Sequence, residues 1–248
     1  MRIILNCFTC QNTHGLPNVS IAEYNDSGVF HLTCSRGHES TTVLQEEKFS
    51  LLFEIACHAI NDGYYREAVS SFASSLERFF EYAVRVMFNH VDSPPDLFKS
   101  CWKDVASQSE RQLGAFVFLW GLVFREKPAI LGTSEVRFRN DVVHKGAIPT
   151  REEALGFGEA IVNVIAPLQA KLVAEASPAC QAVLFKLLRN LASNDSQRPP
   201  VTATPNFFLR DAGDTKPGRL RDYVDCLRKT AGMFRELERF LGAQPKPL

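Results

Sequence analysis

The sequence predicts a mainly α-helical protein, in which a small β-hairpin module is followed by a helical bundle and then by a C-terminal helical appendage. Residues 1–44 hold three cysteines, three histidines and two runs of alternating apolar and polar residues. From Glu46 onward, apolar residues recur every three or four positions, as they do in amphipathic helices. We therefore predict a hairpin module at 1–44, a helical domain at 45–176 and a C-terminal extension at 177–248.

The hairpin is predicted from two β-rich runs, VSIAEY at 19–24 and VFHLTC at 29–34. The residues between them, Asn25-Asp26-Ser27-Gly28, have the composition of a turn. We expect these two runs to pair with one another as antiparallel strands.

The helical elements are predicted from apolar spacing and from signals at their ends. Pro94 and Pro95 end the longest helix, and Thr150 with Glu153 forms a capping box at the start of another. The very apolar stretch 113–124 is interpreted as a buried core helix, and the Pro-rich stretch near 195–206 as a linker. The predicted helices span about 46–61, 65–91, a short segment through Trp102, 108–125, 134–146, 150–176, 178–193 and 218–241.

The composition excludes several classes of protein. The chain has 248 residues and a formal net charge of zero, which excludes broad electrostatic binding to duplex nucleic acid. No stretch approaches the roughly 20 apolar residues of a membrane-spanning helix, and the apolar start of the chain is too short for a signal peptide. The seven cysteines are an odd number and four lie in predicted helices, which argues against a secreted disulfide framework. We expect a cytoplasmic protein without a membrane partner.

Four residues of the N-terminal module have the spacing of metal ligands. Cys7 and Cys10 form one pair, and Cys34 and His38 form a second pair after the predicted hairpin. Two such pairs beside a hairpin predict a zinc ribbon, with Gly37 allowing the second turn. A closed set of four ligands leaves no position for water or substrate, so we expect a structural Zn²⁺ that supplies most of the folding free energy of the module. Three unligated cysteines are the alternative, and His14 and His31 compete with His38 as fourth ligand.

The stretch RFRNDVVHKG, residues 137–146, places Arg139, Asn140 and His144 on one short helix. We expect Ser134 to be the N-cap of this helix and Gly146 to follow its last residue. At about 100° per residue, Arg139 falls on the apolar side of this helix, and Asn140 and His144 fall on the polar side. A guanidinium group on an apolar face needs a carboxylate, a phosphate or a subunit boundary. A salt bridge to Glu77 or Glu81 is therefore one alternative for Arg139. For His144 the alternative is a capping role beside the last carbonyl groups of the helix.

An arginine followed by a polar residue, with a histidine five positions after the arginine, resembles the Arg-x4-6-His motif of the HEPN superfamily. The segment 68–84 also resembles the long amphipathic helix of these domains, and the resemblance covers about residues 46–176. It implies a HEPN-like helical domain with metal-independent endoribonuclease activity, as in toxins and antiviral-defence effectors. RNA is then the substrate, and an antitoxin or another protein of a defence system is a further partner.

The resemblance also implies roles for the three residues. His144 would move the proton when the RNA 2′-OH attacks the adjacent phosphate, Arg139 would hold that phosphate, and Asn140 would orient the imidazole or bind a phosphate oxygen. Arg139 and His144 project about 140° apart on an ideal helix, and family members form composite sites between two protomers. We therefore expect a homodimer. The alternative function is a non-catalytic dimerisation or sensor module whose zinc ribbon binds a protein or a nucleic acid.

Overall fold

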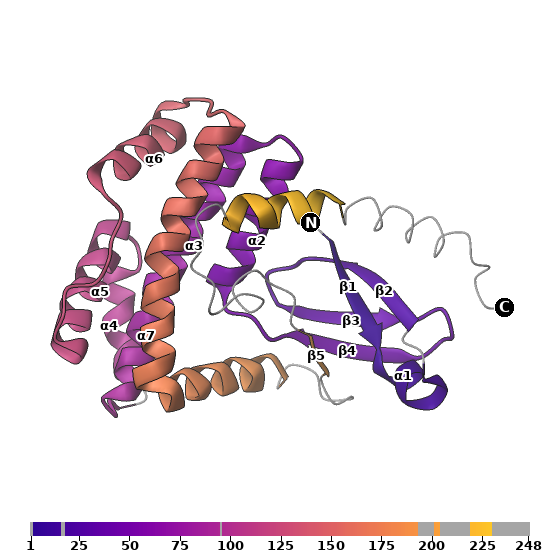
Figure 1. Ribbon diagram of the computed structural model, residues 1–248. Coiled ribbons are helices and arrows are strands. Elements are labelled where there is room, and N and C mark those ends of the chain that lie inside the picture. The colour runs from indigo at the N-terminus through magenta and orange to yellow at the C-terminus, as the bar shows by residue number, and fades with distance from the viewer. Residues whose placement is uncertain (1, 16–17, 95, 193–200, 204–218, 230–248) are drawn as a thin grey trace. The chain divides into compact units, whose positions relative to one another are not determined.

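The computed structural model describes residues 2–15, 18–94, 96–192, 201–203 and 219–229, and this part of the chain is mainly helical, as predicted (Figure 1). The chain divides into two compact units. The first contains the described residues of 1–46, 185–205 and 226–229, and the second those of 47–184 and 219–225. The predicted C-terminal extension at 177–248 is thus divided between the two units.

The first unit contains two small sheets, and their pairing differs from the prediction. The elements are β1 (Arg2–Cys7), α1 (Phe8–His14), β2 (Asn18–Glu23), β3 (Val29–Thr33), β4 (Glu39–Leu44) and β5 (Val201–Ala203). Strand β1 pairs antiparallel with β2, and β3 pairs antiparallel with β4. The predicted hairpin between 19–24 and 29–34 is therefore wrong. The predicted turn does form, since the Gly28 N–H donates to the Asn25 carbonyl and Gly28 has φ +64°, but it connects strands of different sheets.

Strand β5 lies within the stretch that the sequence predicted to be a linker. It pairs in parallel with β4, with Thr42 opposite Val201 and Leu44 opposite Ala203. Its Val-Thr sequence has β-propensity, but prolines surround it and a strand of three residues is too short to show alternation. The other residues of the predicted linker lie outside the described part of the chain.

The second unit contains the predicted helices, with small shifts at their ends. Helix α6 begins at Thr133 with Gly132 as its N-cap, so the predicted N-cap at Ser134 is wrong, whereas Gly146 follows its last residue with φ +74° as predicted. The two helices predicted at 150–176 and 178–193 are present as two helical segments that meet at non-helical backbone at Ala176, two residues before Pro178. Both segments carry the label α7, and residues 185–192 belong to the first unit. The helices are α2 (Lys48–Asn61), α3 (Tyr65–His90), α4 (Leu97–Val105), α5 (Ser109–Phe124), α6 (Thr133–Lys145) and α7 (Arg151–Ala192).

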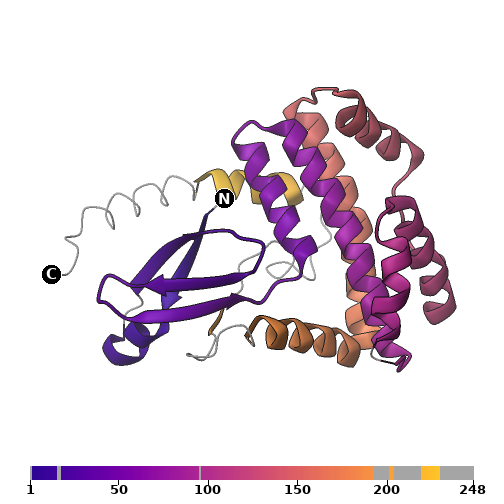
Figure 2. The same ribbon diagram turned by 180° about the vertical axis from the view of Figure 1, so that it is seen from behind.

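Helix α3 lies at the centre of the helical unit and packs against α2, α5 and α6. It also runs alongside α7 in both views of the molecule (Figure 1 and Figure 2). Aromatic pairs fill the contacts: Phe53 of α2 lies 4.9 Å from Phe72, and Phe80 stacks on Phe116 of α5 at 4.6 Å between ring centroids. Where α7 crosses Phe72, it carries Gly158, and a Cβ at that position would lie 2.7 Å from the Phe72 ring. The core thus requires glycine there.

Helix α5 is not the fully buried core helix that its composition predicted. One face, with Phe116 and Trp120, is fully buried, whereas Phe118 is 83% exposed and Leu122 is 62% exposed. A helix that is apolar on all sides gives no periodic signal from which its buried face could be identified. The exposed apolar face is therefore a finding of the structure.

Residues 219–225 pack on the helical unit rather than standing apart from it. Leu220 and Val224 are fully buried. The Tyr223 hydroxyl donates to buried Glu54 of α2 over 2.5 Å, and Arg151 of α7 forms a 2.8 Å ion pair with Asp225. The predicted helix at 218–241 is present over 219–229, and its remainder lies outside the described residues.

The capping box at the start of α7 is confirmed. The Glu153 N–H donates to Thr150 Oγ1 at 3.2 Å, and the Thr150 N–H donates to Glu153 Oε2 at 2.7 Å. The bond from the Thr150 N–H, followed by a 2.9 Å bond from the Thr150 hydroxyl to Glu153 Oε2, holds the pKa of Glu153 below its usual value. The charged form of Glu153 is therefore favoured by folding, and this contribution disappears as the pH falls through the lowered pKa.

Replacing Thr150 with alanine is expected to lower the free energy of unfolding by about 1 kcal/mol, because the Glu153 N–H loses its acceptor. Urea denaturation of the full chain measures this loss. Thr133→Ala is the matched control, since Thr133 begins α6 without serving as its N-cap. An equal loss in both variants would contradict the role of the box.

Within the described residues, one helical segment, Arg151–Asn190, is long and apolar enough by length and composition to cross a membrane. Core helices of the same length pass this test as well. Ile161, Ile165 and Leu172 of this segment are fully buried in the protein, and Pro178 and the kink at Ala176 interrupt it. These three buried residues thus serve the core of the helical unit.

Candidate functional site

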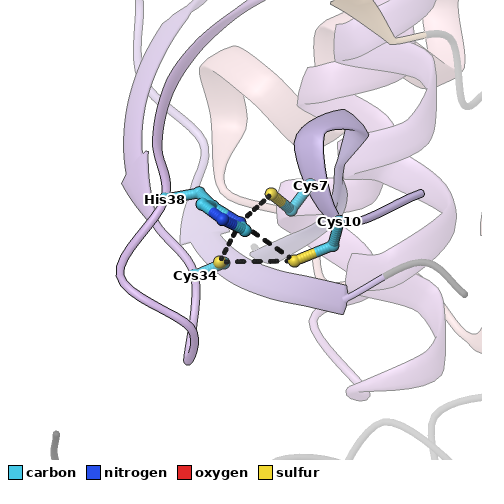
Figure 3. A group of neighbouring side chains, drawn as sticks. All are labelled: Cys7, Cys10, Cys34 and His38. Carbon is cyan, nitrogen blue, oxygen red and sulfur yellow. Dashed lines mark hydrogen bonds between the residues drawn. The ribbon is translucent and has the colours of Figure 1, made fainter. Parts of the chain in front are cut away.

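The first candidate site is a cluster of three thiols and one imidazole in the N-terminal unit (Figure 3). Cys7 ends β1 and is the N-cap of α1, and Cys10 lies in the first turn of that helix. Cys34 and His38 lie in the loop between β3 and β4, where the Cys34 N–H donates to the His38 carbonyl at 3.0 Å. Each ligand pair therefore lies where two paired strands are connected. This arrangement brings together the four predicted metal ligands.

The loop between β3 and β4 turns tightly because Gly37 adopts φ +79°, a conformation that favours glycine. The Gly37 N–H donates to the Cys34 carbonyl at 2.9 Å and closes the turn. The predicted role of Gly37 is thus confirmed.

The distances in the cluster fit a tetrahedral metal ion. Cys10 Sγ lies 3.7 Å from Cys34 Sγ, and His38 Nδ1 lies 3.8, 3.2 and 3.6 Å from the sulfur atoms of Cys7, Cys10 and Cys34. Four ligands around Zn²⁺ at about 2.3 Å for sulfur and 2.0 Å for nitrogen would be separated by roughly 3.8 Å between sulfurs and 3.5 Å between sulfur and nitrogen. The side chains therefore need to move very little to hold the ion.

The chemistry of the cluster also favours a structural metal. All three cysteines are buried and unpaired by disulfides, with Cys10 fully inaccessible. Three thiols packed against an imidazole form a poor hydrophobic core by themselves, because their sulfur atoms and the imidazole nitrogen are polar atoms that contact one another. Because the four side chains supply a complete tetrahedral shell, a bound ion would have no open position for a substrate.

The thiols of the cluster differ in their affinity for protons. Burial, followed by hydrogen bonds with Cys7 and Cys34, raises the pKa of Cys10 to about 11. Burial also acts to raise the pKa of Cys34, but hydrogen bonds from the backbone N–H groups of Arg36 and His38, together with those from the thiols of Cys7 and Cys10, outweigh it and lower that pKa. In the metal-free protein, Cys10 therefore carries a proton that a metal ion must displace.

Zinc affinity is accordingly expected to fall as the pH decreases. Cys10 alone should contribute about a tenfold weaker apparent affinity for each pH unit below its raised pKa, because one proton is released when the metal binds. Competition titrations with a zinc indicator, made one pH unit apart in the neutral range, measure this slope. An affinity that does not change with pH would contradict binding through the Cys10 thiolate.

Of the two competing fourth ligands, His31 does not join the cluster. His31 lies in β3 opposite Thr41, and its ring is exposed and within 3.2 Å of the Thr41 hydroxyl. This agrees with the prediction that His31 is a sheet residue. The side chain of His14 lies outside what the structure describes.

The second candidate site is helix α6, which carries Arg139, Asn140 and His144. The helix packs on α3, and its Phe138 contacts Phe157 of α7 with 5.6 Å between ring centroids. Arg139 and Asn140 are partly buried, and His144 is exposed in the last turn. In the described part of the chain, no hydrogen bond or ion pair joins these three side chains.

The salt bridge that was the alternative role of Arg139 is not formed. Glu81 binds Arg78 and Arg85 instead, with the Arg85 contact at 3.0 Å. Among the described residues, neither Glu77 nor any other carboxylate lies within ion-pair distance of the Arg139 guanidinium. Arg139 is therefore a partly buried cation whose charge the described part of this chain does not neutralise.

The polar face of α6 also contains an ion pair that was not predicted from the sequence. Lys145 contacts Asp141 at 2.8 Å, one turn apart on the helix, and this contact lowers the pKa of Asp141. The spacing of an acidic and a basic residue at positions i and i+4 is the signal that identifies such a pair. With Asp141 engaged by Lys145, His144 has no carboxylate partner among the described residues.

The chain was compared with protein-family models, curated proteins and solved structures, and none of them matches it.

Proposed function

We propose that the protein is a metal-independent endoribonuclease of the HEPN type, which acts as a homodimer and cuts RNA by attack of a 2′-OH on the adjacent phosphate. The partly buried Arg139 without a carboxylate partner in the described part of the chain is the observation that carries this proposal. A guanidinium in such a position is costly unless an anion joins it, and its planar fork matches two oxygens of a phosphate. An RNA phosphate supplies that anion.

The other residues of α6 fit the remaining chemical requirements. The exposed imidazole of His144 is free to accept the 2′-OH proton and to return a proton to the leaving 5′-oxygen. Asn140 lies one turn before His144 and would orient the imidazole or donate to a phosphate oxygen. The bond from the 2′-oxygen to phosphorus forms as the bond to the 5′-oxygen breaks, which leaves a 2′,3′-cyclic phosphate and a 5′-hydroxyl.

A homodimer is part of the proposal because Arg139 and His144 of one copy do not point toward the same phosphate. Arg139 and His144 lie five positions apart on a regular helix, so their side chains diverge by about 140°. Two copies of α6 facing one cleft would allow Arg139 of one copy to work with His144 of the other. In this account the Cys3His cluster holds a structural zinc, and its unit serves recognition of RNA or of a regulatory protein in a toxin or antiviral-defence system.

The experiment that tests the proposal is incubation of the purified full chain with a mixed RNA pool in EDTA, without added Mg²⁺. The zinc content is measured before and after, so that loss of the structural metal is not mistaken for loss of a catalytic one. Products with 2′,3′-cyclic phosphate ends are expected from the wild type and not from Arg139→Ala or His144→Ala. Cleavage that persists in both variants would overturn the assignment.

The rival function is a non-catalytic dimerisation or sensor module. It predicts no cleavage of any RNA by the wild type, with dimerisation and zinc content intact. The same experiment therefore separates the two functions.

A further inference from the structure

We propose that the exposed face of α5 is the surface through which two copies of this chain associate, by antiparallel packing of their α5 helices about a twofold axis near Phe118. This outer face of α5 is defined here by Arg111, Ala115, Phe118, Leu122 and Arg125, which follow one another at intervals of three or four residues. The inference goes beyond the proposed function, because an antiparallel pair of α5 helices is a different contact from a cleft between two copies of α6, and it is argued from the exposed face of α5 alone.

The outer face of α5 is more apolar than a solvated helix surface. Phe118 is 83% exposed and Leu122 is 62% exposed, and they lie one turn apart. Helices α4 and α5 lie at the outer margin of the helical unit in both views (Figure 1 and Figure 2). An exposed apolar patch at such a place on a folded protein indicates an interaction site.

The same surface contains an apolar pocket of about 460 Å³ between α3, α4 and α5. Phe88, Phe98 and Trp102 form its wall, with Phe98 stacked on Trp102 at 5.6 Å, and Phe118 and Leu122 lie at its rim. A protruding aromatic side chain and an aromatic pocket thus lie on one surface. A twofold axis places each protruding side chain beside the pocket of the other copy, which is the self-complementarity that an isologous interface requires.

Two glycines give a second reason for close approach of another helix. Gly114 and Gly121 lie inside α5, where each glycine costs roughly 1 kcal/mol relative to alanine. A Cβ at Gly114 would meet no atom of this chain within 4 Å, and one at Gly121 would meet only a backbone oxygen at 3.8 Å. Packing inside the described chain therefore does not require either glycine. A second helix that lies against this surface would benefit from the missing side chains.

The charges at the two ends of α5 favour an antiparallel pair of identical helices. Glu110 and Arg111 are exposed at the N-terminal end, and Arg125 and Glu126 are exposed at the C-terminal end. Glu126 already pairs with Lys171 of the same chain at 3.3 Å. The contact that antiparallel packing centred near Phe118 adds is therefore between Glu110 of each copy and Arg125 of the other. Arg111 then also lies near the C-terminal carbonyl groups of the other α5, where a cation is favoured. A small apolar ligand in the pocket would leave Phe118 exposed on its outer side, whereas a second helix covers it.

The test is the mass of the full chain in solution, measured by sedimentation over a broad range of concentration without RNA. The wild type is expected to be a dimer, and Phe118→Glu is expected to weaken the dimer at least about 30-fold, as for a central interface residue. Phe185→Glu is the matched control, because Phe185 of α7 is also 61% exposed and receives the same substitution. A monomeric wild type would overturn the inference, as would a Phe118→Glu variant that dimerises as the wild type does.

A second variant is expected to raise the stability of the fold while it weakens the association of two copies. Gly114→Ala is expected to raise the thermal stability of the chain when it is dilute and monomeric, because alanine favours the helix and its Cβ has open space. The same change is expected to weaken the dimer about tenfold, because the added methyl group separates the two helices. A Gly114→Ala dimer as tight as the wild type would contradict close packing of α5 against α5.

The proposed function and this inference fail in different ways. A dimer that depends on Phe118 but cleaves no RNA would contradict the proposed ribonuclease activity and support the proposed interface. A wild type that cleaves RNA as a monomer would contradict the interface and the composite site, and would support the ribonuclease activity.

Discussion

Replacing His144 with alanine is expected to reduce RNA cleavage by at least about 100-fold, because the imidazole is the only proton-transfer group in the proposed mechanism. The side chain is exposed in the last turn of α6, so its removal should leave the fold and the zinc content unchanged. Cleavage rates under single-turnover conditions, with the cyclic-phosphate ends quantified, measure the loss. Thermal unfolding of the same preparations verifies that the variant is folded.

The chain offers a close control for His144. His90 is also exposed and also lies in the last turn of a helix, α3. If His144 serves only as a favourable cation at a helix end, then His90→Ala and His144→Ala should both cause small changes in stability and no change in cleavage. Equal cleavage by these two variants would thus refute the catalytic role.

Arg139→Lys separates the charge of Arg139 from its shape. Lysine retains the positive charge but lacks the planar fork that contacts two phosphate oxygens. This variant is therefore expected to lose most of the cleavage activity that Arg139→Ala loses. A fully active Arg139→Lys variant would show that the fork is not used.

Replacing Cys10 with serine is expected to abolish zinc binding and to unfold the strands β1 to β4. Cys10 is fully buried and its sulfur lies within 3.7 Å of both Cys34 Sγ and His38 Nδ1. Structural zinc in small domains contributes on the order of 10 kcal/mol of apparent binding free energy, which these short strands cannot replace. Elemental analysis should find about one zinc per wild-type chain and none in the variant. Limited proteolysis should then cut within residues 1–46.

The control for Cys10 is Cys101→Ser, since Cys101 is exposed and belongs to α4 in the helical unit. It should retain the zinc and the protease resistance of the wild type. A wild-type chain that contains no zinc, or a Cys10→Ser variant as resistant as the wild type, would rule out a structural metal in this cluster.

Local signals in the sequence predicted much of the helical unit correctly. Thr150 and Glu153 specify the start of α7, and Gly146 specifies the end of α6, because each forms its bonds or adopts its backbone conformation within a few residues. The four clustered ligands were identified for a similar reason, since the two residues of each pair lie within four positions of one another in the sequence. Features formed by residues that are close in sequence could thus be predicted.

Strand pairing and helix orientation could not be predicted in this way, because they depend on residues far apart in the chain. The β2 and β3 runs are joined by a proper turn, yet each pairs with another strand. The exposed side of α5 likewise could not be predicted from the sequence, because all sides of this helix are apolar. Only the positions of α3 and α4 determine which side is covered.

The pairing of β4 with β5 has a consequence for the synthesis of the protein. Thr42 lies opposite Val201, so about 160 residues separate two strands that share backbone hydrogen bonds. While the chain emerges from the ribosome, β4 has an open edge until residues 201–203 follow, long after the helical unit has begun to form. An early zinc ion would hold β3 and β4 together during this interval. A sheet whose first two strands are synthesised early is therefore among the last to be completed.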